Sequence, residues 1–396
     1  MKAAAALAIA LALAAPAAQA ATANVSSPDE ALVSARRLYN EGRYFQASRY
    51  AFLAGASDRL RGEAYSLITV SLVHAGLYQS AAYFFIRTLQ EGDQIAVRRA
   101  LTVTEALFRH VDGDLFRRYL IRRTQPGDYD ASNRSAFAYA VGKEALLRGD
   151  EAAAVRQLDS VSHSSPLWPF SLQIRATAKA ILGDSNGALH DFEECASRAD
   201  STANRDGGDD QWLARAKAEA SDLKARCQAG VARSLYEQGR FRDADKAYDE
   251  IPKASFVWTD ILFEQAWNAY AEREYNRTLG KLVTYKSPGL SFVFNPEVDV
   301  LTAQAYLALC LYGDANQVIN AFNGKYEKVG KDVKRFVDTT GLNLLPYYEA
   351  GKKAMKGRLH QAGDFDRLMN RFVRAPYFRR LVDAEESLPT EQAAIR

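Results

Sequence analysis

The stretch Gly42-Arg-Tyr44-Phe-Gln-Ala47 decides the fold, because it returns 34 residues later as Gly76-Leu-Tyr78-Gln-Ser-Ala81. The same spacing separates Gly149-Asp-Glu151 from Gly183-Asp-Ser185, and Gly239-Arg-Phe241 from Arg273-Glu-Tyr275. Weaker copies begin at Gly113 and Gly313. A fixed period of this length indicates stacked supersecondary units, each of which contacts its neighbours, rather than one central core.

The residue types around each turn fit a pair of antiparallel helices. Small residues come seven positions before the turn, as at Ala35 and Ala266, and five positions after it, as at Ala47 and Ala244. A short side chain lets two helices approach more closely than the usual ~8–10 Å. The glycine supplies the positive φ that ends the first helix. Each unit is therefore predicted to be a helix-turn-helix.

With this period and pattern, the chain resembles the tetratricopeptide repeat (TPR) family. The resemblance implies an all-α fold, a right-handed TPR superhelix or α-solenoid of about eight units with a concave groove and a C-terminal helical cap. The array is expected to cover residues 21–332, with an insertion at about 197–218, followed by a basic cap and tail at 333–396. Units are predicted to begin near residues 28, 62, 99, 135, 169, 225, 259 and 299.

The N-terminus has the pattern of a signal peptide. Lys2 precedes an apolar run from Ala3 to Ala15, and Ala18-Gln19-Ala20 provides the small residues that a signal peptidase accepts. We expect cleavage after Ala20 and a periplasmic protein. No later run is apolar enough to span a membrane, so no transmembrane segment is expected in the mature chain. No cysteine follows the cleavage position, so no lipid anchor is indicated.

Charge is unevenly distributed. The whole chain carries a formal net charge of +3, which argues against a nucleic-acid binder. Residues 325–380, however, hold 14 Lys and Arg against 6 Asp and Glu, with apolar residues still at helical spacing. One interpretation is a helical cap with a solvated charged side. The other is a surface for an anionic partner such as acidic lipid headgroups, an anionic wall polymer or an acidic protein.

The sequence offers no pattern of catalytic or cofactor-binding residues, so we expect no enzyme activity and no cofactor. No histidine pair has the spacing of a zinc-protease site, and no nucleotide-binding glycine motif occurs. The acidic, glycine-rich run at 204–210 lacks the ligand register of an EF-hand loop. We therefore predict no metal site.

The three cysteines show no metal-binding spacing. Cys195 ends the second helix of the fifth unit, and Cys227 lies in the first helix of the sixth unit, which should pack against it. In an oxidising compartment these two residues could form a disulfide. The alternative is that Cys195, Cys227 and Cys310 are three unbonded, buried small residues.

Repeat arrays of this kind bind ligands through the first helix of each unit, so inward-facing positions of units six and seven are candidate binding residues. They are Arg226, Arg233, Tyr236, Asp260, Phe263, Trp267 and Tyr270. Phe263, Trp267 and Tyr270 form one aromatic stripe, which would suit an extended or helical apolar peptide. The alternative is that the array closes on itself or on its C-terminal helices, and that the stripe is core.

A second resemblance covers Ala254 to Phe322. It is carried by Trp258-Thr-Asp260, Glu264-Gln-Ala-Trp267, Leu279-Gly280-Lys-Leu282, Ser287-Pro288, Pro296-Glu297 and Tyr306-Leu-Ala-Leu-Cys310. This block resembles exported TPR proteins of deltaproteobacterial gliding-motility gene clusters. The resemblance implies a non-catalytic periplasmic scaffold or adaptor in an envelope-spanning complex, with association with the outer membrane as an option. Its partners would be other envelope proteins or peptides.

A second functional class stays open at this point. The protein could instead serve peptidoglycan or outer-membrane biogenesis as an accessory that binds wall enzymes or glycan. The same repeat architecture fits both classes, because repeat arrays are binding surfaces and not tied to one pathway.

Overall fold

The computed structural model describes residues 27–111, 113–202, 210–357, 363–374 and 376–395. The predicted signal peptide, residues 1–20, and most of the acidic run at 204–210 lie outside these ranges. Within them the regular structure is entirely helical, so the all-α helical-repeat fold expected from the period is confirmed. The chain divides into two compact units, one of residues up to Ile174 together with those from Arg379 onward, the other of Arg175–Phe378.

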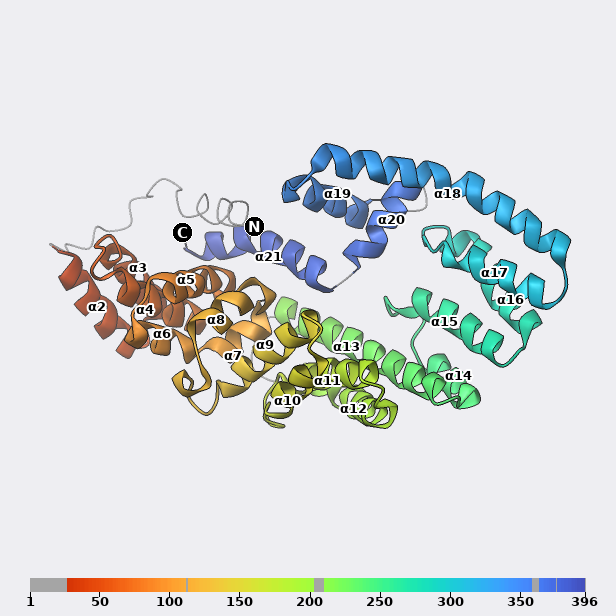
Figure 1. Ribbon diagram of the computed structural model, residues 1–396. Helices are drawn as coiled ribbons and strands as arrows, with labels where there is room; N and C mark the ends of the chain where they lie inside the picture. Colours follow the sequence, from red (N-terminus) through yellow and green to blue (C-terminus); the bar gives the residue numbers. More distant parts are fainter. Residues whose placement is uncertain (1–26, 112, 203–209, 358–362, 375, 396) are drawn as a thin grey trace. The chain divides into compact units, whose positions relative to one another are not determined.

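The first unit is built from consecutive helix pairs (Figure 1). Its helices are α2 (Pro28–Asn40), α3 (Tyr44–Ala54), α4 (Arg61–His74), α5 (Tyr78–Glu91), α6 (Gln94–Leu101), α7 (Thr104–His110), α8 (Arg117–Arg123), α9 (Arg134–Leu147) and α10 (Glu151–Asp159), with 3-10 turns at Gly113–Leu115 and Pro126–Asp128. Helix α11 (Trp168–Ile181) crosses into the second unit.

The second unit continues the pairing. Its helices are α12 (Ser185–Arg198), α13 (Asp210–Glu237), α14 (Phe241–Asp249), α15 (Trp258–Ala271), α16 (Tyr275–Val283), α17 (Glu297–Ala308), α18 (Tyr312–Thr340), α19 (Leu344–Lys356) and α20 (Asp364–Val373), with 3-10 turns at Ala199–Thr202, Thr284–Lys286 and Pro288–Leu290. Helix α21 (Pro376–Ile395) begins in this unit and belongs to the first from Arg379 onward.

The turns show why the glycines recur. Gly42, Gly76, Gly149, Gly183 and Gly239 all have φ between 72° and 83°, the left-handed conformation that only glycine adopts without strain. Each lies between the first and second helix of a pair. The second helices α3 and α5 begin 34 residues apart, as do α10 and α12, and α14 and α16.

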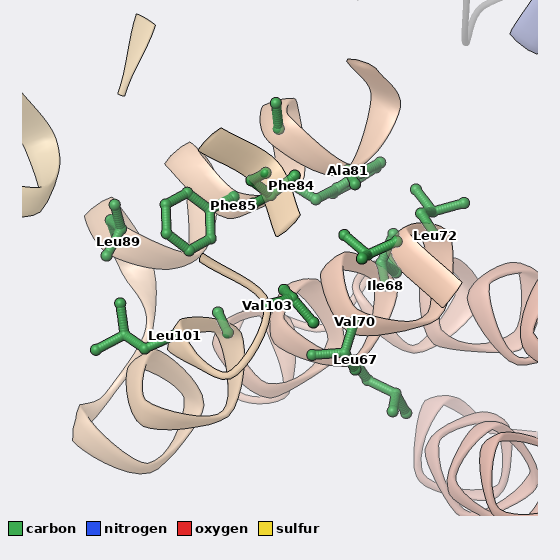
Figure 2. Packing of buried hydrophobic residues seen from close by; sticks show 14 of the residues in the cluster. Leu67, Ile68, Val70, Leu72, Ala81, Phe84, Phe85, Leu89, Leu101 and Val103 are labelled. Atoms are coloured by element: carbon green, nitrogen blue, oxygen red, sulfur yellow. The ribbon is translucent and has the colours of Figure 1, made fainter. Parts of the chain in front are cut away.

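The core follows the predicted placement of small residues. Ala35, Ala47, Ala81 and Ala266 are fully buried, and a Cβ added at Gly142 would lie 2.5 Å from the Leu158 side chain. In Figure 2, apolar side chains of α4 and α5 lie against each other, with Leu101 and Val103 beside them. Close helix contact at small residues therefore lets the larger neighbours interdigitate.

The third pair departs from the expected repeat. Its first helix begins at Gln94, not near residue 99, and is split between α6 and α7. Asn133 explains the split, because its side chain accepts from the Glu105 N–H at 3.0 Å and donates to the Thr102 carbonyl at 3.0 Å, replacing bonds of a continuous helix. Gly113 does not form a left-handed turn; it is buried, and a Cβ there would overlap the Phe108 ring.

The last pair is also shifted from its expected position. Cys310, with φ of 59°, makes the turn between α17 and α18, while Gly313 lies inside α18. Helix α18 then runs without a break through residue 332, where the array was expected to end. The sequence signal failed because glycine is preferred at a left-handed turn but not required, as Arg273 with φ of 62° also shows.

Within the first unit, a carboxylate of the C-terminal helix binds the start of α5. Glu391 accepts hydrogen bonds from the N–H of Gln79 at 2.8 Å, the N–H of Ser80 at 2.9 Å and the Ser80 hydroxyl at 2.7 Å. These amides belong to the first turn of α5, where donors have no partner within the helix. The carboxylate therefore satisfies them and opposes the helix dipole.

Candidate functional site

The aromatic stripe lies on α15, and its three members differ in exposure. Phe263 is only 9% exposed and packs with Ala266, Leu282, Val298 and Leu301. Trp267 and Tyr270 are half-buried against the same cluster, with ring centroids 5.6 Å apart. Phe263 is thus a core residue, whereas Trp267 and Tyr270 keep part of their rings at the surface.

An ion pair joins the first helices of two neighbouring pairs. The Arg233 guanidinium on α13 donates to both carboxylate oxygens of Glu264 on α15, at 2.8 and 2.6 Å. The hydroxyl of Tyr248 on α14 donates to the same carboxylate at 3.1 Å. Burial acts to lower the pKa of Arg233, but the Glu264 carboxylate outweighs it and the pKa is raised. Three helices therefore share one carboxylate.

Asp260 lies one turn before Glu264 on α15 and is exposed. Partial loss of solvent raises the pKa of its carboxyl group, although the guanidinium groups of Arg374 and Arg371 oppose the shift. Arg374, at the end of α20, donates to the Thr259 hydroxyl at 2.8 Å. The C-terminal helices of the second unit thus bring positive charge to the start of α15.

The two remaining candidates lie on α13. The guanidinium of Arg226 is 5.5 Å from the ring centroid of Phe256. Tyr236 is half-buried, packs against the cluster around Ala232 and Tyr248, and contacts the Phe241 ring at 5.4 Å. Both residues pack against apolar neighbours, so the open polar part of this face consists chiefly of Arg233, Asp260 and the partly exposed Glu264.

The first unit contains a similar arrangement that the sequence analysis missed. Glu63 on α4 accepts from Arg36 Nε on α2 at 3.0 Å and from Arg99 Nη1 on α6 at 3.3 Å. Again a carboxylate links the first helices of successive pairs. No local sequence pattern predicts such ion pairs, because the partners lie 27 to 36 residues apart and come into contact only when the helices stack.

The structure gives the bonding state of all three cysteines. Cys195 on α12 and Cys227 on α13 form a buried disulfide with a Cα–Cα distance of 5.9 Å, whereas Cys310 is free and exposed. The alternative of three unbonded, buried cysteines is therefore wrong. The bond joins the last turn of α12 to the middle of α13, six residues before Arg233.

A cavity of about 620 Å³ lies elsewhere in the second unit, at the junction of α18, α19 and α20. It is lined mainly by apolar surface, including Phe336, Pro346 and Phe365. In the described part of the chain, no three His, Cys, Asp or Glu side chains come close enough together to hold a metal ion. No helix in that same part has both the length and the apolar character of a membrane span.

Comparisons with known proteins leave the fold assignment to the chain itself. No family model matches the chain, and no curated protein matches it. Among solved structures, it is similar to the TPR domain of P58(IPK), with 13% sequence identity over 80% of this chain and 99% of that chain and a TM-score of 0.25. The assignment to helical repeats rests instead on the chain's own helix pairs and left-handed turns.

Proposed function

We propose that the protein is a non-catalytic scaffold that binds protein partners on the face shared by the first helices of neighbouring pairs. The observation that carries this proposal is the cross-helix pairing of Arg233 with Glu264, repeated in kind at Arg36, Glu63 and Arg99. Such pairing holds exposed charged groups at fixed positions along successive helices. Rigid, exposed charge of both signs suits a polypeptide that carries complementary charge.

We further infer that this scaffold works in the periplasm, after removal of residues 1–20, in an envelope-spanning complex such as a gliding-motility apparatus. The signal-peptide pattern and the resemblance of Ala254 to Phe322 support this inference. The basic C-terminal region, residues 333–396, offers a second surface, for an anionic partner.

The test is a double charge swap. Arg233→Glu combined with Glu264→Arg keeps an ion pair but reverses the charge at both positions. The control is the swap Arg37→Glu with Glu41→Arg, an exposed pair within one turn of α2 and its C-cap in the first unit. Full-length protein would be cross-linked in the native periplasm and co-purified, and the mature chain should begin at Ala21.

The expected result is loss of the cross-linked subunits with the first swap alone, while the helical circular dichroism spectrum of the protein is retained. Motility or transport subunits among them would support the scaffold proposal, and wall synthases or hydrolases would favour the accessory role in wall biogenesis. Retention of every partner by the Arg233/Glu264 swap would contradict the proposed face. Digestion of peptidoglycan by the purified protein would contradict a non-catalytic role.

A further inference from the structure

The loop between α18 and α19 exposes three leucines. In Gly341-Leu342-Asn343-Leu344-Leu345, Leu342 is 99% exposed, Leu344 52% and Leu345 51%. Each leaves apolar area in water that a folded protein normally buries. A cluster of this kind, unlike a single exposed leucine, marks a surface that contacts something else.

The loop is held in place by hydrogen bonds at both ends. Gly341, at φ of 56°, ends α18 and donates its N–H to the Val337 carbonyl at 2.9 Å. The Asn343 side chain accepts from the Leu345 N–H at 3.2 Å and begins α19. The exposure of Leu342 therefore belongs to a defined turn, with each helix end satisfied.

The aromatic residues beside the loop already have partners. Phe336 packs against Tyr347 and Phe365, with ring centroids 5.2 Å apart in both cases, and the Tyr347 hydroxyl donates to the Gly341 carbonyl at 3.1 Å. These contacts occupy part of the inner side of the hairpin, beside the cavity that Phe336, Pro346 and Phe365 line. The leucines lie outside this packing, so the hairpin itself supplies no cover for them.

The hairpin behind the loop is rich in basic residues, although Asp338 and Glu349 lie nearer the tip than the first of them. Residues 325–356 contain eight Lys and Arg against four Asp and Glu, a net charge of +4. Lys334 lies eight residues before Leu342 and Lys352 eight residues after Leu344, which is about 12 Å along each helix at 1.5 Å per residue. Amphipathic segments enter the boundary between headgroups and acyl chains by ~5–10 Å. The backbone of these lysines would lie a few ångströms above that depth, and their long side chains could extend to the lipid phosphates.

We propose that the α18–α19 hairpin tip docks on a bilayer that contains anionic lipid, with Leu342, Leu344 and Leu345 entering between the headgroups. The lysines and arginines behind the tip bind the phosphates. This proposal rests on the anionic-partner role given to the basic C-terminal region and names its ligand. A lipid surface suits the composition better than a protein groove, because binding hot spots between proteins favour Trp, Tyr and Arg over Leu, and their cores are depleted in Lys.

The first experiment measures co-sedimentation of the full-length mature protein with vesicles. Vesicles of phosphatidylcholine with phosphatidylglycerol are compared with vesicles of phosphatidylcholine alone. The test variant carries Leu342→Ser, Leu344→Ser and Leu345→Ser. The matched control carries Val33→Ser, Ile95→Ser and Leu147→Ser, three exposed apolar residues of the first unit.

We expect the wild type and the control to bind the anionic vesicles with equal affinity. The tip variant should bind at least about tenfold more weakly. Neutral vesicles should bind all three proteins poorly. Equal binding of the tip variant and the wild type, or no binding of the wild type to anionic vesicles, would overturn the proposal. Should the tip variant lose its fold, Lys334→Glu combined with Lys352→Glu tests the same docking through charge.

A second measurement reports depth. Leu342→Trp should be quenched by lipids with brominated acyl chains, whereas Ile95→Trp should not, and equal quenching at both positions would contradict insertion of the tip. The Arg233/Glu264 charge swap separates this proposal from the scaffold proposal, because it should leave vesicle binding unchanged. If the tip variant loses a cross-linked protein but keeps vesicle binding, the tip is a protein-docking surface and the lipid proposal is wrong.

Discussion

Two apolar groups of the second unit, the α15 stripe and the α18–α19 tip, differ in their exposure to solvent. Phe263 on α15 is 9% exposed, whereas Leu342 at the tip is 99% exposed. Helix α15 packs against α14, α16 and α17, and eight of its 14 residues are buried. Helix α18 buries only Ala315 and Val329 in 29 residues. In a repeat array, a helix with neighbours on both sides becomes core, and one that extends beyond its neighbours offers surface.

The largest expected effect is at Phe263. Phe263→Ala should lower the free energy of unfolding by about 3–5 kcal/mol, because it leaves a cavity among Ala266, Leu282 and Leu301. Denaturant unfolding followed by circular dichroism measures the change. The matched control is Phe372→Ala, an exposed phenylalanine of α20, which should change stability by less than about 0.5 kcal/mol. Equal losses of unfolding free energy for the two variants would contradict the contrast between the buried α15 stripe and the exposed C-terminal helices.

An intermediate effect is expected from the disulfide. Replacing Cys195 and Cys227 by Ser should lower the free energy of unfolding by about 3 kcal/mol, since the bond closes a loop of some 30 residues in the unfolded chain. Cys310→Ser serves as the control. A reductant should destabilise the wild type and the Cys310→Ser protein but not the double variant, and vesicle binding by the tip should persist in all. If the reductant left the free energy of unfolding of the wild type unchanged, this bond would add no stability.

The smallest effect is expected at the tip. Leu342→Ser, Leu344→Ser and Leu345→Ser together should change the free energy of unfolding by no more than about 0.5 kcal/mol, because these side chains bury little area within the chain. The same unfolding measurement checks this. A loss near that of Phe263→Ala would mean that the leucines are covered in solution, and the contrast between the two groups would fail.

Much of the fold was predictable because its cause is local. A glycine at positive φ and a small residue five positions later are properties of one turn and one helix contact, so Gly42 and Gly76 reveal the period without any structure. The turn at Cys310 was misplaced because a neighbouring glycine, Gly313, carried the stronger local signal.

The candidate site was less predictable because its contacts are distant. Arg374 donates a hydrogen bond to Thr259, which lies 115 residues earlier in the chain. No sequence pattern around either residue predicts this contact. Position within a helical pattern placed Phe263 and Trp267 on one stripe, but it could not show which of them the α16 and α17 side chains would cover. The exposure of the three leucines at the tip is not predictable from the sequence for the same reason, because exposure depends on which neighbours cover a side chain.

The contact of Glu391 with α5 has a consequence for the order in which the first unit is completed. Domains usually form in the order of their synthesis, the N-terminal one first. Here the first turn of α5 receives its carboxylate partner from a residue that lies 312 positions after Gln79. The repeats of the first unit can form beforehand, but the amides of Gln79 and Ser80 gain this partner only after Arg175–Phe378, the whole second unit, has been synthesised. The first unit is therefore completed by a segment that is translated after the second unit.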